Sequence, residues 1–354
     1  MKKAITMIML AGLTSFLIAT GPADLRSENL RKPLTAVSAP AFSNLRIERM
    51  RTLTYEAVPK KALDQQSARN LLSGLAERSA VKMSFEKVEK LNGRLIFSSP
   101  EDPSAVFDID ANNGAFLLNT GLKRYSGDES SKNLPSGKEA PELAKKYLLD
   151  TGFLPKKGQE MVLAHVGGLN MAVSKEGRSV GNFRKLVTVR FSRVLNGLPV
   201  QGPGSKIVVQ LGHDGELQGM IHNWPEVSAK SLPAAALKSD EEIRRETGLR
   251  LRREAGEAQS VAIRSSRLVL YDDGRGVIEP AIHVIADARY KGPATKESVN
   301  NPVDFYVPLL KAPKAIYPFM KSAESKMPEG DGRQKSAEAA SRQPSQSQDW
   351  SDGK

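Results

Sequence analysis

Apolar and polar residues alternate along three consecutive runs between residues 187 and 227, which read VTVRFSRVL, IVVQL and LQGMIHNW. Turn signals separate the runs, an Asn-Gly pair at 196–197 and a His-Asp-Gly triplet at 213–215. Alternation with period two between such turns is typical of antiparallel strands joined by hairpins. The pattern therefore predicts a β-meander, whereas residues 174–182, rich in Ser, Gly and charge, predict a mobile loop before it.

Three other segments show the spacing of helices. Apolar residues recur every three or four positions in residues 67–78 and 141–152, and residues 239–255 carry Glu-Arg pairs four apart, which favour an exposed helix. Gly152 and Gly256 are the expected stops. Shorter runs of β-forming residues predict further strands at residues 81–88, 94–98, 105–109, 115–118, 159–166, 261–271, 276–289 and 304–310.

The amino terminus has the organisation of a secretory signal peptide. Lys2 and Lys3 precede a run of apolar or small residues at 4–19, and further small residues follow. An uncleaved membrane anchor is the alternative, but the run is short for a bilayer span. We therefore expect a signal peptide within residues 1–23, cut after Ala19 or Ala23 on export to the periplasm or the exterior. Residues 24–46, which mix Pro, Ser, Ala and charge, should form a linker.

Composition narrows the possible chemistry. The chain has 354 residues and no cysteine, which excludes disulfides, thiolate zinc sites and a cysteine nucleophile. Its 52 basic and 40 acidic residues give a net charge of +12, which favours acidic partners or anionic envelope polymers. The charges are mixed along the chain, so we expect no nucleic-acid site. Residues 319–354 have almost nothing apolar and predict a disordered tail.

The strand that enters the Asn-Gly turn continues into Gly197, Pro199, Val200 and Gly202. This run resembles the fungalysin/thermolysin propeptide (FTP) pattern, in which a strand runs into Gly-(Leu/Ile)-Pro-Val and a short glycine turn leads to the next strand. The FTP family is non-catalytic and usually accompanies PepSY domains in the pro-regions of secreted peptidases. The resemblance implies an architecture and a compartment, and no reaction.

Two further segments resemble PepSY domains. Residues 108–114 read DIDANNG, similar to the turn that closes a PepSY meander, and residues 268–274 and 279–290 read LVLYDDG and EPAIHVIADARY. The resemblance implies an α+β fold class of helix-plus-antiparallel-meander (PepSY/FTP-like) domains. The expected domains are a PepSY-like one at residues 47–133, an FTP-like one at residues 134–231 and a second PepSY-like one at residues 232–318.

Histidines give no sign of a peptidase centre. A propeptide of this class would normally precede a metallopeptidase with a His-Glu-x-x-His motif, which this chain lacks, and no two of its four histidines are four residues apart. Metal sites need convergent ligands at fixed spacing, so we interpret the histidines as structural. They are His165, His213, His222 and His283.

Two other patterns imitate known sites. Asp108, Asp110 and Asn112 match the start of a calcium loop, but Asn113 and Asn119 stand where that loop needs glycine and a bidentate glutamate. A strand-end turn is therefore the better interpretation. Two Ser-x-x-Lys pairs, Ser79 with Lys82 and Ser84 with Lys87, lack the partner motifs of serine enzymes. We assign no catalytic, cofactor-binding or metal-binding residue and expect no cofactor.

The leading hypothesis is an exported, non-catalytic protein that binds another protein. The partner would be a secreted peptidase or another envelope protein, and the role that of an inhibitor, a chaperone or a regulator of a secreted or periplasmic hydrolase. We expect no transmembrane segment after signal cleavage. Peripheral contact with the cell envelope is compatible with the sequence. One alternative is a basic envelope-associated structural or polymer-binding protein. Another is a hydrolase with an unrecognised site.

Overall fold

The computed structural model describes residues 7–10, 53–78, 85–121, 125, 130–175, 178–291 and 298–318. Two compact units divide the chain, residues 1–315 and 316–354, and the fold and the site described below lie in the first. The predicted linker and tail, most of the predicted leader, and Ser79, Lys82 and Ser84 lie outside the described residues. Among the helices in the described ranges, none has the length and apolar character that a bilayer crossing requires.

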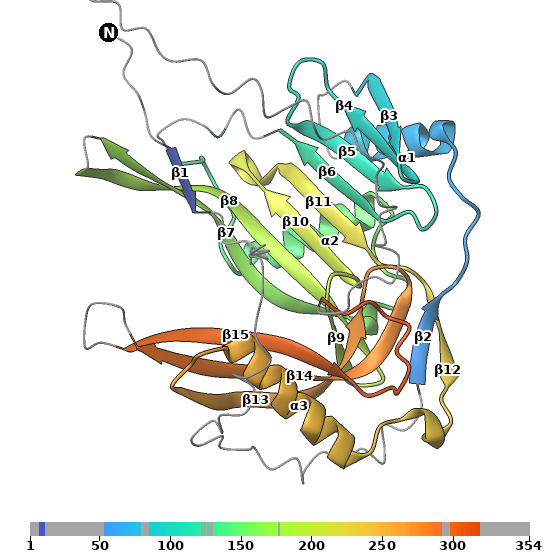
Figure 1. Ribbon diagram of the computed structural model, residues 1–354. Helices are drawn as coiled ribbons and strands as arrows, with labels where there is room; N and C mark the ends of the chain where they lie inside the picture. The colour runs from blue at the N-terminus through green and yellow to red at the C-terminus, as the bar shows by residue number, and fades with distance from the viewer. Residues whose placement is uncertain are drawn as a thin grey trace, which may run out of the picture. The chain divides into compact units, whose positions relative to one another are not determined.

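Three α-helices and fifteen strands make up the described chain (Figure 1). The helices are α1 (Gln65–Arg78), α2 (Glu139–Asp150) and α3 (Asp240–Ala255). The strands are β1 (Met7–Leu10), β2 (Leu53–Ala57), β3 (Lys87–Leu91), β4 (Arg94–Ser98), β5 (Ala105–Asp110), β6 (Phe116–Thr120), β7 (Met161–Lys175), β8 (Arg178–Leu195), β9 (Leu198–Gln201), β10 (Lys206–Leu211), β11 (Leu217–Asn223), β12 (Val227–Ser231), β13 (Ser260–Asp272), β14 (Val277–Lys291) and β15 (Ser298–Pro308).

The expected fold class, α+β helix-plus-antiparallel-meander domains, is wrong. The protein is mostly β, and its described strands join in one mixed sheet with the order β12-β2-β14-β13-β9-β8-β10-β11-β6-β5-β4-β3, from which β1, β7 and β15 branch. The predicted meanders pair with one another along their edges: β6 lies antiparallel to β11, β9 parallel to β13, and β2 antiparallel to β14. Pairing between segments so far apart has no local sequence signal, which is why the periodicity did not predict it.

Most individual elements agree with the sequence predictions, but the mobile loop at residues 174–182 is wrong. Strands β7 and β8 extend into this segment and pair with each other, with Ala172 opposite Asn182 and Lys175 opposite Arg178. Valines 173 and 180 and Phe183 are strand-forming residues, and each added ladder pair satisfies backbone groups that a loop would leave to water. On the outer edge of β7 lies β1, from within the predicted leader.

Glycine and capping residues fix the ends of the elements as predicted. Gly197 and Gly215 have φ values of 79° and 75°, in the left-handed region that favours glycine. Ser239 caps α3 through a capping box with Glu242, and Gly256 ends that helix with φ of 52°. These residues set where the chain reverses, and so where the strand ends meet.

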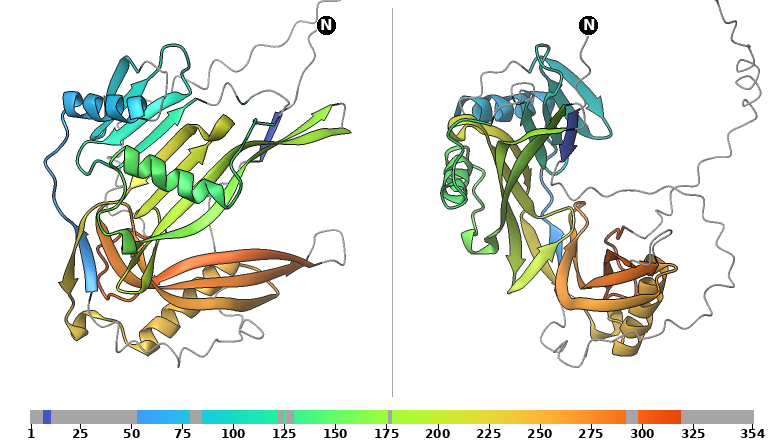
Figure 2. Two further views of the ribbon diagram at one scale, coloured as in Figure 1. Left: turned by 180° about the vertical axis from the view of Figure 1, so that it is seen from behind. Right: turned by 90° about the vertical axis from the view of Figure 1, so that its left-hand side faces the viewer.

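The apolar core leaves one sheet face without a helix. Helices α1 and α2 pack against β4, β5, β6, β8, β10 and β11 around fully buried Phe97, Phe107 and Phe191. Helix α3 packs in the same way on β13, β14 and β15. Figure 2 shows α2 on one face of β8, β10 and β11, and Figure 1 shows no described helix on their other face.

Candidate basic groove

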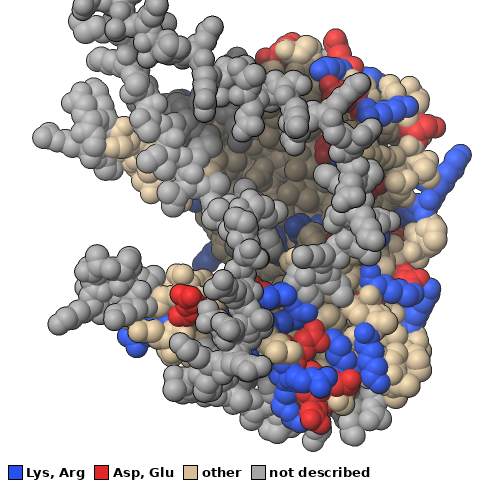
Figure 3. Space-filling model, viewed as in Figure 1, with Lys and Arg blue, Asp and Glu red and all other residues tan. Residues whose placement is uncertain are grey.

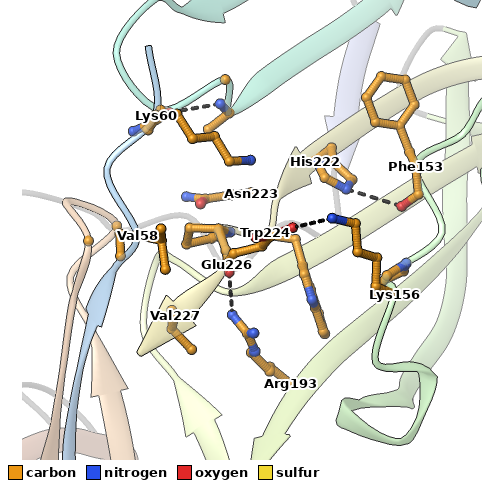
Figure 4. A pocket seen from close by; sticks show the side chains of 18 of the residues that line it. Val58, Lys60, Phe153, Lys156, Arg193, His222, Asn223, Trp224, Glu226 and Val227 are labelled. Atoms are coloured by element: carbon orange, nitrogen blue, oxygen red, sulfur yellow. Dashed lines mark hydrogen bonds and ion pairs between the residues drawn. The ribbon is translucent and has the colours of Figure 1, made fainter. Parts of the chain in front are cut away.

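A cavity of about 570 Å³ opens where connections between the strands converge (Figure 4). Its walls come from the β2–α1 connection, the β5–β6 turn, the segment after α2, the β11–β12 connection and the β13–β14 turn. We call it the basic groove. Its lining includes the apolar Val58, Leu63, Phe153, Leu154, Trp224 and Val227 and the basic Lys60, Lys61, Lys156, Lys157, Arg193 and Arg275.

The carboxylates of the groove are already engaged. Glu226 accepts a hydrogen bond from Lys156 at 2.8 Å, and this ion pair holds the pKa of Glu226 below its usual range. Glu160 is held by Arg193 at 2.6 Å, and Lys157 lies 3.6 Å from it. Glu160, Glu226 and Asp272 are the acidic residues of the lining, against six basic ones. The groove therefore carries an excess of positive charge.

Three of those basic side chains form no hydrogen bond or ion pair with any described residue. Within the described chain, Lys60, Lys61 and Arg275 make no side-chain hydrogen bond and no ion pair, and all three are exposed. Figure 4 shows the Lys60 side chain directed into the groove toward Asn223 and His222. Their charges are available to an anionic ligand.

Arg193 fixes the floor of the groove. The side chain is 4% exposed, and its Nε and Nη2 donate to Oε2 of Glu160 at 2.9 and 2.6 Å. Its Nη1 donates to the carbonyl of Pro225 at 2.7 Å, and the guanidinium lies 5.1 Å from the centre of the Trp224 ring. Arg193 thus holds both the indole and the chain that leads into β12.

His222 packs as a neutral side chain in the groove wall. Its ring stacks on Phe116 with centres 5.5 Å apart, and its Nε2 lies 3.2 Å from the carbonyl oxygen of Phe153. Burial lowers the pKa of His222 to about 4, the Phe153 carbonyl opposes the shift, and the nearby Lys60 adds to it. At neutral pH the imidazole is uncharged and donates to that carbonyl.

The depressed pKa of His222 predicts a loss of stability in acid. In the unfolded chain the imidazole binds a proton below about pH 6.5, whereas the folded chain resists protonation down to about 4. Between these values the unfolded state holds more protons, so the free energy of unfolding should fall by about 3 kcal/mol as pH drops from 6.5 to 4. Urea unfolding of the wild type and His222→Phe at both pH values measures this contribution.

The wild type should lose about 3 kcal/mol more than His222→Phe over that interval. His165 is exposed on β7, so the control variant His165→Gln should keep the steeper pH dependence of the wild type. Parallel curves for the wild type and His222→Phe would show that His222 is not the group responsible.

Asp272 is a buried carboxylate with structural contacts. It accepts hydrogen bonds from the Ser205 hydroxyl at 2.5 Å and from the Gly274 amide at 2.8 Å. Burial raises its pKa above the usual range, and these two hydrogen bonds oppose the shift. A Cβ at Gly204 would lie 2.2 Å from the carboxyl carbon, so only glycine fits there. Asp272 ties the turn after β9 to the end of β13.

The other histidines lie apart from one another. His165 is exposed on β7. The Nδ1 of His213 accepts a hydrogen bond from the backbone amide of Lys132 at 3.1 Å, and buried His283 contacts Asp304 at 2.7 Å. Among the described residues, no group of three or more His, Asp or Glu side chains could hold a metal ion.

The calcium-like sequence forms a turn at the end of β5. Asp108 pairs with Arg94 at 2.7 Å, and Asp110 accepts from the Asn112 amide at 2.8 Å and from the Asn113 side chain at 3.0 Å. These carboxylates are engaged with their own hairpin. The strand-end turn interpretation is confirmed.

Sequence reasoning missed the groove, although a signal for it exists. The tetrapeptides Val58–Lys61 and Leu154–Lys157 read VPKK and LPKK, and most of their residues line the groove from two different connections. Proline stiffens each arm before its lysine pair. The repeated Pro-Lys-Lys after a branched apolar residue is therefore the sequence signal that marks two walls of the groove.

Comparisons with known proteins do not assign a family. No family model matches the chain, and no curated protein matches it. Among solved structures, an uncharacterized protein from Eubacterium rectale ATCC 33656 is 10% identical, with a TM-score of 0.42, over 77% of this chain and 86% of that one. The Bacillus megaterium YpeB C-terminal domain is 11% identical, with a TM-score of 0.31, over 68% of this chain and 99% of that one. Likenesses this weak carry no functional argument.

Proposed function

We propose that the protein is an exported, non-catalytic binding protein whose basic groove holds an extended, acidic segment of a partner protein. The observation that carries the proposal is that Lys60, Lys61 and Arg275 lie beside an apolar floor built around Trp224 and have no hydrogen-bond or ion-pair partner for their side chains among the described residues. Side chains of both kinds in one cleft suit a peptide with carboxylates next to apolar residues.

The hydrogen bonds and ion pairs that the acidic residues of the groove already make support binding over catalysis. Glu160, Glu226 and Asp272 are each tied to a neighbouring donor, and His222 is neutral and directed at a carbonyl. A general base must be able to reach a substrate proton with a pKa near the working pH. The groups of the groove that remain available are cations, which attract an anion and remove no proton.

Export and partner class rest on the sequence. The leader-like amino terminus supports an extracytoplasmic location, and the FTP- and PepSY-like runs support a role toward a secreted or periplasmic hydrolase, as inhibitor, chaperone or regulator. The groove adds the chemistry of the contact, which is a chain bearing Asp or Glu beside apolar side chains.

Trp224 fluorescence tests the groove directly. The chain has two tryptophans, so a Trp350→Phe background leaves Trp224 as the reporter. A twelve-residue peptide alternating Glu with Leu should change the emission saturably, while matched peptides with Gln or Lys in place of Glu should not. Reversal of two charges in Lys60→Glu/Lys61→Glu should weaken binding about tenfold or more.

A control variant carries the same charge reversal on helix α2, outside the groove. Lys145 and Lys146 lie on α2, where they pair with Glu142 and Asp150, so Lys145→Glu/Lys146→Glu should leave the affinity within about twofold of the wild type. Equal losses in both double variants would mean that net charge, not the groove, drives binding. Stronger binding to polygalacturonate than to the peptide would favour the polymer-binding alternative.

A further inference from the structure

Three basic side chains that do not line the groove also lack hydrogen-bond and ion-pair partners among the described residues. Arg190 on β8, Lys206 on β10 and Arg267 on β13 make no side-chain hydrogen bond and no ion pair within the described parts of the chain. Arg190 pairs in register with Val208, so Lys206 is its diagonal neighbour on the same sheet face. We call these three residues the basic cluster.

The third residue of the basic cluster, Arg267, lies in a row of side chains that crosses β13, β14 and β15. Arg267 is directly opposite His283, and His283 is directly opposite Tyr306, so the three side chains share one face. The His283 ring stacks on Tyr306 with centres 4.7 Å apart. Helix α3 packs on the opposite face of these strands, which leaves the row uncovered by that helix.

Strand β9 connects β8, which carries Arg190, with β13, which carries Arg267. Gln201 pairs with Tyr271 across the parallel β9–β13 contact, and its side chain accepts a hydrogen bond from the Tyr306 hydroxyl at 3.2 Å. Tyr306 thus links the row on β13, β14 and β15 to β9, which pairs with β8, the strand that carries Arg190. Burial and then Asp304 raise the pKa of Tyr306 to about 12, and Arg267 and Arg190 act in the opposite direction.

Two carboxylates that act on these residues or on Tyr306 are held by other groups. Asp272 accepts from Ser205 and Gly274, and Asp304 is in contact with His283 at 2.7 Å. Half-buried Lys206 has a lowered pKa, because burial and then the neighbouring Arg190 disfavour its charge, although Asp272 acts in the opposite direction. The cluster thus gathers positive charge that the described chain leaves without an anion.

We infer that Arg190, Lys206 and Arg267 form a second binding site, for a compact ligand with two or more adjacent negative charges. Figure 3 shows the molecule hollowed over the open face of β8, β10 and β11, with Lys and Arg side chains at the foot of the hollow. Two guanidinium groups and an ammonium group suit a diphosphate or a polycarboxylate. This site goes beyond the proposed peptide groove and shares no residue with it.

Isothermal titration with sodium pyrophosphate and with citrate, at constant ionic strength, tests the site and separates its two ligand classes. Saturable binding of either probe is expected. The affinity should fall about tenfold or more in Arg190→Gln/Arg267→Gln, and by a similar factor in Lys206→Met. Arg264→Gln is the matched control, because Arg264 lies on the same strand as Arg267 but is already paired with Asp287, and its affinity should stay within about twofold of the wild type.

The groove variant Lys60→Glu/Lys61→Glu separates this inference from the proposed function, since it should retain pyrophosphate or citrate binding. Pyrophosphate alone would identify a phosphate site, and citrate alone a polycarboxylate site. No saturable heat with either probe, or undiminished affinity in both cluster variants with circular dichroism unchanged, would overturn the inference.

Discussion

Replacing Arg193 with methionine is expected to lower the free energy of unfolding by about 3–5 kcal/mol, because a buried ion pair then loses one member. The Glu160 carboxylate would keep only Lys157, which is 3.6 Å away and exposed. Arg193 is 4% exposed and Glu160 13%. The change also removes the donor to the Pro225 carbonyl and the cation that lies against Trp224. Urea unfolding at neutral pH measures the loss.

An exposed arginine provides the matched control. Arg264 makes a two-pronged contact with Asp287, yet its side chain is 67% exposed, so Arg264→Met should cost less than about 1 kcal/mol. Adding Glu160→Gln to Arg193→Met should recover part of the loss, since it removes the buried carboxylate that has lost its main partner. Similar losses for Arg193→Met and Arg264→Met would contradict the account of the groove floor.

The Gly202→Ala variant is expected to lose about 3–4 kcal/mol of stability, through backbone strain and a steric clash together. Gly202 has φ of 104°, and a Cβ there would lie 2.3 Å from the backbone oxygen of Asp272. Since that oxygen belongs to the end of β13, the clash would separate β9 from β13 where the two halves of the sheet join.

A Gly197→Ala variant separates backbone strain from the steric clash. Its φ is 79°, but a Cβ there would meet nothing within 4 Å, so Gly197→Ala should cost about 1 kcal/mol from conformation alone. Chemical denaturation of both variants gives the difference. If Gly202→Ala is no less stable than Gly197→Ala, the close contact between the β9 turn and β13 is not as described.

Local elements were predictable because their signals are local. Strand β4 has its predicted bounds, and α3 begins one residue after its predicted start because Ser239 caps it. The sheet was not predictable in this way. Whether Phe116 of β6 lies beside His222 of β11 depends on packing between distant segments, and alternation in each strand fits several partners equally well.

The groove shows the same limit for a site. Most of its residues come from five connections, and no single stretch of sequence holds enough of them to reveal a pocket. The repeated Pro-Lys-Lys marks two of its arms, but the repeat does not say that they converge, or that Lys156 is neutralised by Glu226 while Lys60 has no partner in the described chain. Those facts require the fold.

Site-specific photocrosslinking can show whether the groove holds an acidic segment of a partner protein. A benzoylphenylalanine at Val58, 40% exposed in the groove wall, is compared with one at Leu249, 52% exposed on α3, in the native extracytoplasmic fraction. We predict that the Val58 probe captures a protein through a segment rich in Asp or Glu, that Leu249 does not, and that Lys60→Glu/Lys61→Glu abolishes capture. Equal capture from both positions, or capture that survives the charge reversal, would contradict the proposed function.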